Sequence, residues 1–334
     1  MSDLTSLLKN ADEYRAELLA QLQEESTTCY RLFHGTNEGA LGLTVDRYGS
    51  QLLIQTFHEA LSDEQVAQIS GHYMPLFDVQ EVVYNDRSAK NSRRQDEHNK
   101  RSIDRVGQEI GVNYRVRGKH AGQDPLLFLD MRVGRRYVLD NANNKTVLNL
   151  FSYTCGVGVC AAVAGAEKVV NVDFAERNLD VGKENAQLNN LNNDQIEFIQ
   201  SDFFTAAKQF AGMPIKQRVK RGQKPRPYPQ LEEQQFDLVY LDPPRWAKSH
   251  FGTVDLIRDY QSVLKPSVLA TKPGGTLICT NNVAKVDINE WLELVKRCAN
   301  KAGQPVVDYE ILHPEADFPS ADGQHPLKIA VLHF

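Results

Sequence analysis

The chain has 334 residues, which is too long for one typical domain and suits two. Its formal net charge of −5 excludes a uniformly basic nucleic-acid binder, and its 41% hydrophobic content is enough for a full globular core. No apolar run approaches the roughly 20 residues of a membrane span, and the five scattered cysteines lack the spacing of a metal site or a disulfide framework. We therefore predict a reduced cytoplasmic protein that binds neither membrane nor metal.

Residues 1–120 predict a small α+β domain, a candidate RNA-contacting unit. Apolar residues recur at helical spacing through residues 1–25, and two β-rich runs then meet at Tyr48-Gly49-Ser50, which is typical of a hairpin. A helix over Ser62 to His72 and a strand over Val79 to Tyr84 follow.

Cations outnumber acids between residues 86 and 120. Lysine and arginine clusters supply most sequence-independent affinity for nucleic acids, so this section is either a phosphate-contacting strip or a solvated linker of mixed charge. Its cations include Arg87, Lys90, Arg93, Arg94, Lys100 and Arg101, with Lys119 after a short strand.

Residues 121–334 predict an α/β domain, and 146–173 contain its main motif. A buried strand over 146–150 leads into a turn with Gly156 and Gly158, a helix, and a second strand that ends on Asp173. Such a crossover is what parallel pairing requires. Glycines let a ligand approach the backbone, and an acid at the tip of the second strand can accept both hydroxyls of a ribose. Because the third glycine of G-x-G-x-x-G is missing, the motif favours S-adenosylmethionine (SAM) over a dinucleotide, unless the glycines only serve packing.

Two further acids follow predicted strands. Asp202 comes after the strand over 195–200 and either meets an adenine amino group or caps the next helix. Asp242 follows the strand over 236–241 and precedes two prolines, which fix their φ angles and so hold the carboxylate and Trp246 in place. Trp246 is then placed to stack on a base taken out of its stack, unless the segment is only a rigid turn.

A basic insertion interrupts this domain at residues 212–231. It contains six cations, four prolines, two glycines and no acid, so it is either a mobile arm for RNA phosphates or a disordered surface loop. Downstream, the sequence predicts helices over 261–270 and 288–302, a turn at Pro273-Gly274-Gly275 before a strand over 276–280, and a closing strand pair at 306–312 and 327–334.

Residues 128–334 resemble the class I SAM-dependent RNA methyltransferases that modify large-subunit ribosomal RNA. Residues 30–55 resemble the small domain that precedes the catalytic domain in that group. The resemblance rests on FLDMR (128–132), NLFSYTCGVGV (149–159), VVNVD (169–173), DPPRW (242–246), GGTLICTNN (274–282) and HPLKIAVLHF (325–334). It implies a Rossmann-like, mostly parallel sheet with an antiparallel last strand. Cys155 departs from the family, which usually has glycine there.

The resemblance also implies roles for individual residues. Phe151, Ser152 and Tyr153 would line the methionine side of the cofactor, while Asp173 would bind the ribose and Asp202 the adenine. Asp242 would face the transferred methyl group, and Trp246 and Asn282 would hold the target base. The other cofactor-binding residues implied are Arg132, Asn149, Gly156, Phe174 and Phe203. From its position alone, Arg132 could equally form an ion pair with Asp130 at the domain junction.

The group contains two chemistries. One branch makes 5-methylcytosine by adding a cysteine thiolate to the base, and that cysteine lies at the position of Asn282. Cys279 is three residues away and is predicted to be a core residue. The other branch is similar to the K domain of the bacterial K/L enzyme, and it methylates guanine N7 with a Ser-Asn-Asn segment that Thr280-Asn281-Asn282 match.

We therefore predict a 23S ribosomal RNA methyltransferase specific for guanine N7. The alternatives are cytosine C5, a protein or small-molecule substrate, and a non-catalytic RNA-binding factor. The sequence leaves open whether the substrate is free RNA or a large-subunit assembly intermediate. It also leaves open whether the chain works as a monomer or a homodimer.

Overall fold

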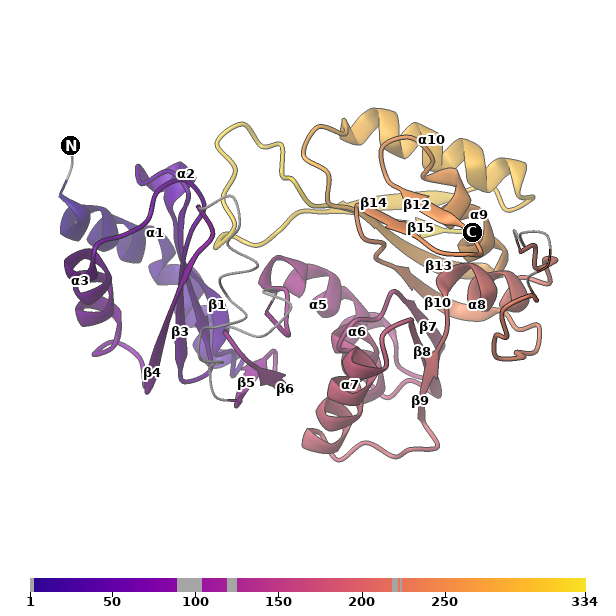
Figure 1. Ribbon diagram of the computed structural model, residues 1–334, viewed down its shortest axis with the longest axis horizontal. Coiled ribbons are helices and arrows are strands. Elements are labelled where there is room, and N and C mark those ends of the chain that lie inside the picture. The colour runs from indigo at the N-terminus through magenta and orange to yellow at the C-terminus, as the bar shows by residue number, and fades with distance from the viewer. Residues whose placement is uncertain (1–2, 89–103, 119–124, 218–221, 223) are drawn as a thin grey trace. The chain divides into compact units, whose positions relative to one another are not determined.

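The computed structural model describes residues 3–88, 104–118, 125–217, 222 and 224–334. The chain divides into two compact units (Figure 1). The first comprises Met1–Arg132 together with Pro314–Gln324, and the second comprises Val133–His313 and His325–Phe334. The chain therefore returns to the first unit near its C-terminus. The sequence analysis placed a single domain boundary between residues 120 and 121 and did not predict this return.

The first unit is built on a four-stranded sheet in the order β1-β2-β3-β4. The predicted hairpin at Tyr48-Gly49-Ser50 is confirmed, because Tyr48 of β2 pairs with Gln51 of β3. The apolar faces of α1 and α3 pack on one side of this sheet. The sequence missed a second hairpin, formed by β5 and β6. The elements are α1 (Leu4–Glu24), β1 (Cys29–His34), α2 (Gly35–Glu38), β2 (Leu43–Tyr48), β3 (Gln51–Thr56), α3 (Asp63–Tyr73), β4 (Glu81–Asp86), β5 (Arg105–Glu109), β6 (Val112–Val116) and the 3-10 helix η2 (Leu129–Met131).

The second unit contains a seven-stranded sheet in the order β14-β15-β13-β10-β7-β8-β9 (Figure 1). Strands β9, β8, β7, β10 and β13 pair in parallel, while β15 is antiparallel to both β13 and β14. This confirms the predicted α/β fold with its antiparallel closing pair. The strands are β7 (Thr146–Leu150), β8 (Lys168–Asp173), β9 (Ile196–Gln200), β10 (Phe236–Leu241), β13 (Thr271–Asn281), β14 (Asp308–Leu312) and β15 (Lys328–His333).

Helices cover both faces of this sheet because side chains alternate along each strand. Leu148, Val172 and Leu241 share a core with α8, α9 and α10, whereas α6 and α7 pack on the other face, where Asn149 and Asn171 lie. The helices are α5 (Arg132–Asn141), α6 (Gly156–Val163), α7 (Glu176–Leu188), α8 (Phe203–Phe210), α9 (Gln261–Leu269) and α10 (Ile288–Lys301). Among the helices of the described residues, none has the length and apolarity needed to cross a membrane.

Two details of the second unit differ from the sequence prediction. A small hairpin of β11 (Trp246–Lys248) and β12 (Thr253–Asp255) follows the double proline, and it was not predicted. The turn predicted at Pro273-Gly274-Gly275 lies inside β13. Between the pairs Phe236–Thr271 and Leu238–Thr276, β10 advances by two residues and β13 by five, so the extra residues form an irregularity within the strand.

Candidate functional site

Acidic residues meet at one edge of the seven-stranded sheet. Because β7, β8 and β10 are parallel neighbours, their carboxyl ends lie at the same edge, which is where open α/β sheets bind ligands. Asp173 is the last residue of β8, and Asp242 directly follows β10. Asp202 follows β9, the neighbour of β8, by two residues. The structure therefore brings the three predicted acids to one side of the sheet.

The loop after β7 has an uncommon backbone. Phe151, Tyr153 and Cys155 have φ angles of 57°, 49° and 60°, in the left-handed region. Side chains disfavour this region by about 1–2 kcal/mol per residue, and such strain clusters at functional sites. The glycine that the family usually has at position 155 adopts this φ without that penalty. Here Gly182 makes room for the cysteine, because a Cβ atom at Gly182 would lie 2.5 Å from Cys155 Sγ.

Asp173 holds this loop. Its Oδ2 accepts a hydrogen bond from the Tyr153 backbone N–H at 2.9 Å, and its Oδ1 accepts one from the Ala175 N–H at 2.9 Å. Its side chain is buried, and that burial raises the carboxyl pKa above its ordinary value, although the backbone donors oppose the shift. Ser152 is held at the same place, since its N–H donates to the Val172 carbonyl.

Gly158 and Asn149 serve packing between α6 and the sheet. Asn149 Nδ2 donates to Asn171 Oδ1 at 2.9 Å, and a Cβ atom at Gly158 would lie only 2.0 Å from that oxygen. The turn after β7 consists of residues 151–155, and α6 begins at Gly156, so neither Gly156 nor Gly158 lies in the turn itself. The expectation that Gly158 opens the turn to a ligand is therefore replaced by a close-packing role.

A cavity of about 220 Å³ opens at this edge. It brings together five of the predicted cofactor-binding residues: Phe151, Asp173, Phe174, Asp202 and Phe203. The rings of Phe151 and Phe203 stack with centroids 4.5 Å apart. Asp202 also caps α8, since its Oδ1 accepts the Phe204 N–H at 2.8 Å. The β11–β12 hairpin supplies part of the wall, and sequence reasoning missed this contribution because such short strands have no periodic pattern.

Asp242 is held from the neighbouring strand. Its Oδ1 accepts a hydrogen bond from the Thr280 hydroxyl, and the Thr280 carbonyl in turn accepts one from the Tyr260 hydroxyl at 2.8 Å. The register explains the contact. Leu241 pairs with Cys279 in the parallel β10–β13 ladder, so the residues that follow them, Asp242 and Thr280, also lie beside each other. The sequence analysis did not assign this role to Thr280. The contact could have been predicted from the pairing of β10 with β13, because the residues at the carboxyl ends of two paired parallel strands lie side by side.

Neither Trp246 nor Asn282 lines the cavity. Trp246 begins β11 and is 60% exposed, while its neighbour Ala247 points the other way and lines the cavity. Asn282 follows β13 directly and is exposed, whereas Asn281 is buried and donates to the Leu256 carbonyl. The exposed indole is available to a ligand larger than the cavity.

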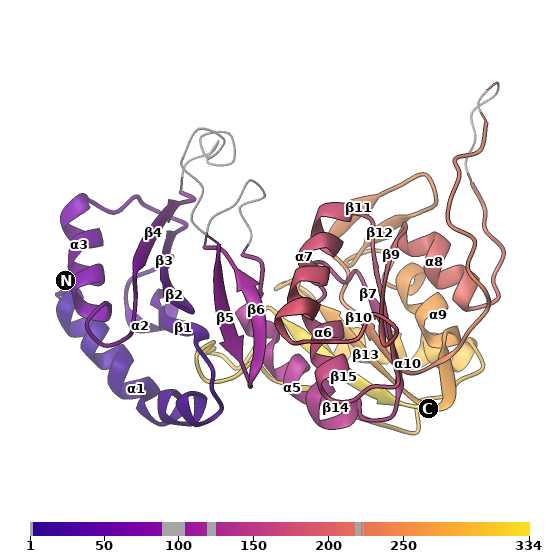
Figure 2. The same ribbon diagram turned by 90° about the horizontal axis from the view of Figure 1, so that it is seen from below.

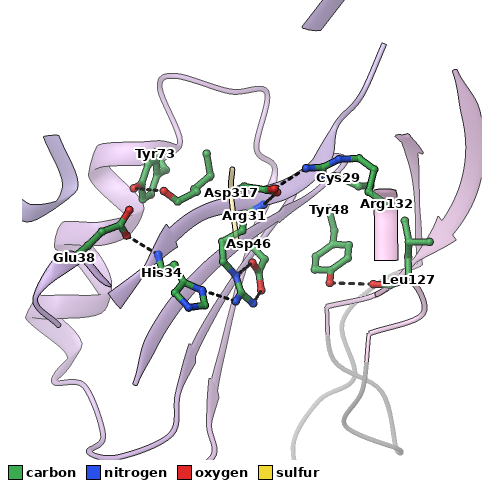
Figure 3. Close-up of polar contacts among 11 residues, drawn as sticks. Cys29, Arg31, His34, Glu38, Asp46, Tyr48, Tyr73, Leu127, Arg132 and Asp317 are labelled. Carbon is green, nitrogen blue, oxygen red and sulfur yellow. Dashed lines mark hydrogen bonds and ion pairs between the residues drawn. The ribbon is translucent and has the colours of Figure 1, made fainter. Parts of the chain in front are cut away.

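Arg132 belongs to the first unit and is not among the residues that line the cavity. Its guanidinium forms an ion pair with Asp317 at 2.6 Å and donates to the Cys29 carbonyl (Figure 3). It forms a second ion pair with Glu315 at 2.7 Å. The side chains of Arg132 and Asp317 are each 1% exposed. Burial disfavours the charge of Arg132, but the two carboxylates outweigh it and raise the guanidinium pKa. The sequence offered two roles for Arg132, cofactor binding or an ion pair with Asp130, and the ion pairs in the structure are instead with Glu315 and Asp317, which follow β14.

Some predicted phosphate contacts lie outside the described residues. In the strip between residues 86 and 120, only Arg87 is described among the cations named above, and it lies over the Phe57 ring. The cations outside the description are Lys90, Arg93, Arg94, Lys100, Arg101, Lys119, Arg218, Lys220 and Arg221.

Comparison with known proteins identifies the chemistry. Residues 95–220 match the family model described as S-adenosylmethionine-dependent methyltransferase. The chain is 28% identical to ribosomal RNA large subunit methyltransferase I of Aeromonas salmonicida, over 93% of this chain and 74% of that protein. It is 34% identical to methyltransferase K/L of Psychrobacter cryohalolentis, over 51% of this chain and 20% of that protein.

Solved structures share the fold of the whole chain. The structure of SMU.776 in complex with SAH has a TM-score of 0.78 at 20% identity and covers 98% of this chain and 80% of its own. The acids at the sheet edge, the strained loop and these similarities agree. The chain is a SAM-dependent methyltransferase, and it is related to the large-subunit ribosomal RNA methyltransferases.

Proposed function

We propose that the enzyme methylates N7 of a guanine in 23S ribosomal RNA, in the cytoplasm. The relatives named for large-subunit ribosomal RNA support this substrate class, and the 34% identity to a K/L enzyme supports the guanine branch. The observation that carries the choice of base is the burial of Cys279. Its side chain is 0% exposed, and burial raises the pKa of its thiol to about 12. A neutral, buried thiol is a poor nucleophile for cytosine.

The residues around the cavity fit an adenosine-containing cofactor. The rings of Phe151, Phe174 and Phe203 offer apolar surfaces to a flat base, and Phe174 remains 71% exposed. The carboxylates of Asp173 and Asp202 accept hydrogen bonds, as ribose hydroxyls and an adenine amino group require. In this proposal Asp173 binds the ribose and Asp202 the adenine. Ser152, Tyr153 and Gly156 shape the loop toward the methionine end.

The proposed chemistry needs positioning more than activation. SAM supplies an electrophilic methyl group. Guanine N7 has a lone pair and no proton to remove, so the enzyme needs neither a nucleophile nor a base. Methylation leaves a positive charge on the guanine, and the Asp242 carboxylate, held by Thr280, stabilises that charge as it develops. Trp246 and Asn282 hold the base.

The proposal is tested on ribosomal RNA from a strain that lacks the gene. The 23S RNA is digested, and its modified nucleosides are quantified by mass spectrometry. We expect 7-methylguanosine to decrease by one site and to return with a plasmid copy of the gene. A missing 5-methylcytidine would assign the chain to the cytosine branch. Unchanged RNA would favour a protein or small-molecule substrate.

Replacing Cys279 with Ala is expected to change the methylation rate by less than about threefold, because the thiol makes no bond to the base in this proposal. The measurement is transfer of a labelled methyl group to RNA from the deletion strain, below the unfolding temperature of the variant. Complete loss of activity in folded protein would contradict the guanine assignment.

Replacing Trp246 with Ala is expected to lower kcat/KM for RNA about 10- to 100-fold, since stacking of a base on an aromatic ring contributes about 1–3 kcal/mol. SAM affinity, measured by calorimetry, should not change, because Trp246 does not line the cavity. Trp246→Phe is the matched control and should retain most of the activity. Equal kcat/KM in the Ala variant and the wild type would remove the stacking role.

A further inference from the structure

A second, larger depression lies in the second unit beside the cofactor cavity. It measures about 1240 Å³ and is bounded by α8, residues 213–217, the β11–β12 hairpin and the start of α9. Four lysines line it, namely Lys208, Lys216, Lys248 and Lys265. We call this feature the lysine groove.

The groove concentrates positive charge on a protein whose net charge is −5. Asp259 is the only acid among the described residues that line the groove. Among the described residues, none of the four ammonium groups forms an ion pair with a carboxylate. Lysines left unpaired and close together attract anions, and each is a point-charge donor for a phosphate.

Lys208 shows that the groove is partly desolvated. Its ammonium lies over the Phe204 ring, 5.3 Å from the centroid. Burial lowers the pKa of this lysine, the nearby Asp202 opposes the shift, and the charge of Lys216 adds to it. Lys208 and Lys216 line the same groove, and an anion bound between them would relieve the repulsion of their charges.

The outer wall of the groove is an ordered structure. Gln217 Nε2 donates to the Arg226 carbonyl, and Gln217 Oε1 accepts the Arg226 N–H, both at 2.8 Å, so one amide side chain joins the two legs of the insertion. Figure 2 shows the first leg as it leaves α8 and the second beside it as it returns toward β10. Gln209 of α8 donates a hydrogen bond to the Pro229 carbonyl and accepts one from the Leu231 N–H. The Tyr228 ring contacts the ring of Phe251 in the β11–β12 hairpin.

The groove adjoins the cofactor cavity. Phe204, Lys248, Ser249 and Gly252 line both. A polymer in the groove would therefore have one of its units directly beside the cavity where the methyl group is supplied.

We propose that the lysine groove binds the phosphodiester backbone of the RNA strand that carries the target base, with the base of the insertion as its outer wall. This inference rests on the proposed function. It names the surface that recruits the substrate, and it predicts contacts that are insensitive to sequence and sensitive to salt, because they are made by lysines to phosphates.

The test compares two double variants. Lys216→Gln with Lys265→Gln removes two exposed groove charges and leaves the cavity residues intact. Lys145→Gln with Lys301→Gln removes two charges outside the groove and is the matched control. RNA affinity is measured as a function of salt with 23S RNA transcribed in vitro, and SAM affinity by calorimetry.

We expect the groove variant to bind RNA about tenfold more weakly at 0.1 M salt, and its slope of log affinity against log salt to fall by about 1.4, at about 0.7 per lost contact to a single strand. The groove variant should bind SAM as tightly as the wild type does. The control variant should match the wild type in both RNA affinity and SAM affinity. Unchanged RNA affinity and slope in the groove variant would overturn this inference alone. A wild-type protein that binds SAM but no RNA would overturn the proposed function as well.

Discussion

Replacing Asp173 with Asn is expected to weaken SAM binding about 100-fold. Hydrogen bonds to a charged group contribute about 1.5–3 kcal/mol each, and two ribose hydroxyls donate to this carboxylate in our proposal. The substitution also turns one acceptor of the carboxylate into a donor, which would face the N–H of Tyr153 or Ala175. The loop after β7, already in left-handed conformations at three residues, loses its anchor at the same time.

The measurement is calorimetry with Asp180→Asn as the control, because Asp180 is an exposed residue of α7 that pairs with Lys183. The pH dependence gives a second readout. Burial raises the Asp173 pKa, and only the ionised form accepts with both oxygens, so SAM affinity should fall on acidification at a pH above the range of an ordinary aspartate. Asp173→Asn should remove this dependence. Binding within threefold of wild type would exclude Asp173 as the ribose ligand.

The sheet and its acidic edge could be predicted because the relevant signals are local. Each central strand is a short apolar run that a turn or an acid ends, and parallel strands bring their ends together whatever lies between them. Asp173, Asp202 and Asp242 were therefore found without any knowledge of distances. The closing pair β14–β15 followed in the same way.

The walls of the site could not be predicted, because they depend on pairing between segments without a pattern. Strands β11 and β12 have three residues each, which is too short for an alternating pattern to be recognised in the sequence. The packing of Gly158 on Asn171 and of Gly182 on Cys155 depends on which helix covers which strand. The local sequence suggested a ligand-binding turn for Gly158 and no role for Gly182.

Arg132 illustrates a contact that sequence spacing cannot reveal. Its partners Glu315 and Asp317 lie 183 and 185 residues away in the chain, and they return to the first unit after β14. From the sequence alone, Arg132 is expected either to bind the cofactor or to pair with the nearby Asp130. Its actual partners lie next to it only because residues 314–324 fold back onto the first unit.

Replacing Asp317 with Ala is expected to destabilise the first unit by about 3 kcal/mol. Removing one partner of a buried ion pair costs about 3–5 kcal/mol, because the other charge stays buried, and Glu315 compensates in part. Asp317 Oδ2 also accepts the Arg31 backbone N–H at 3.0 Å (Figure 3), so β1 loses a tie to the returning segment. Asp317→Asn keeps the shape and should cost less.

Hydrogen exchange with mass spectrometry is the suitable measurement, because both tryptophans, Trp246 and Trp291, belong to the second unit and do not report on the first. A loss of 3 kcal/mol corresponds to amides of β1 exchanging about 100-fold faster, while amides of β10 should keep their rate. Asp322→Asn is the control, since Asp322 lies in the same returning segment but is exposed and bonds to Ser320 and Gln324 nearby. If β1 exchanged at the wild-type rate in Asp317→Ala, residues 314–324 would have no part in the stability of the first unit.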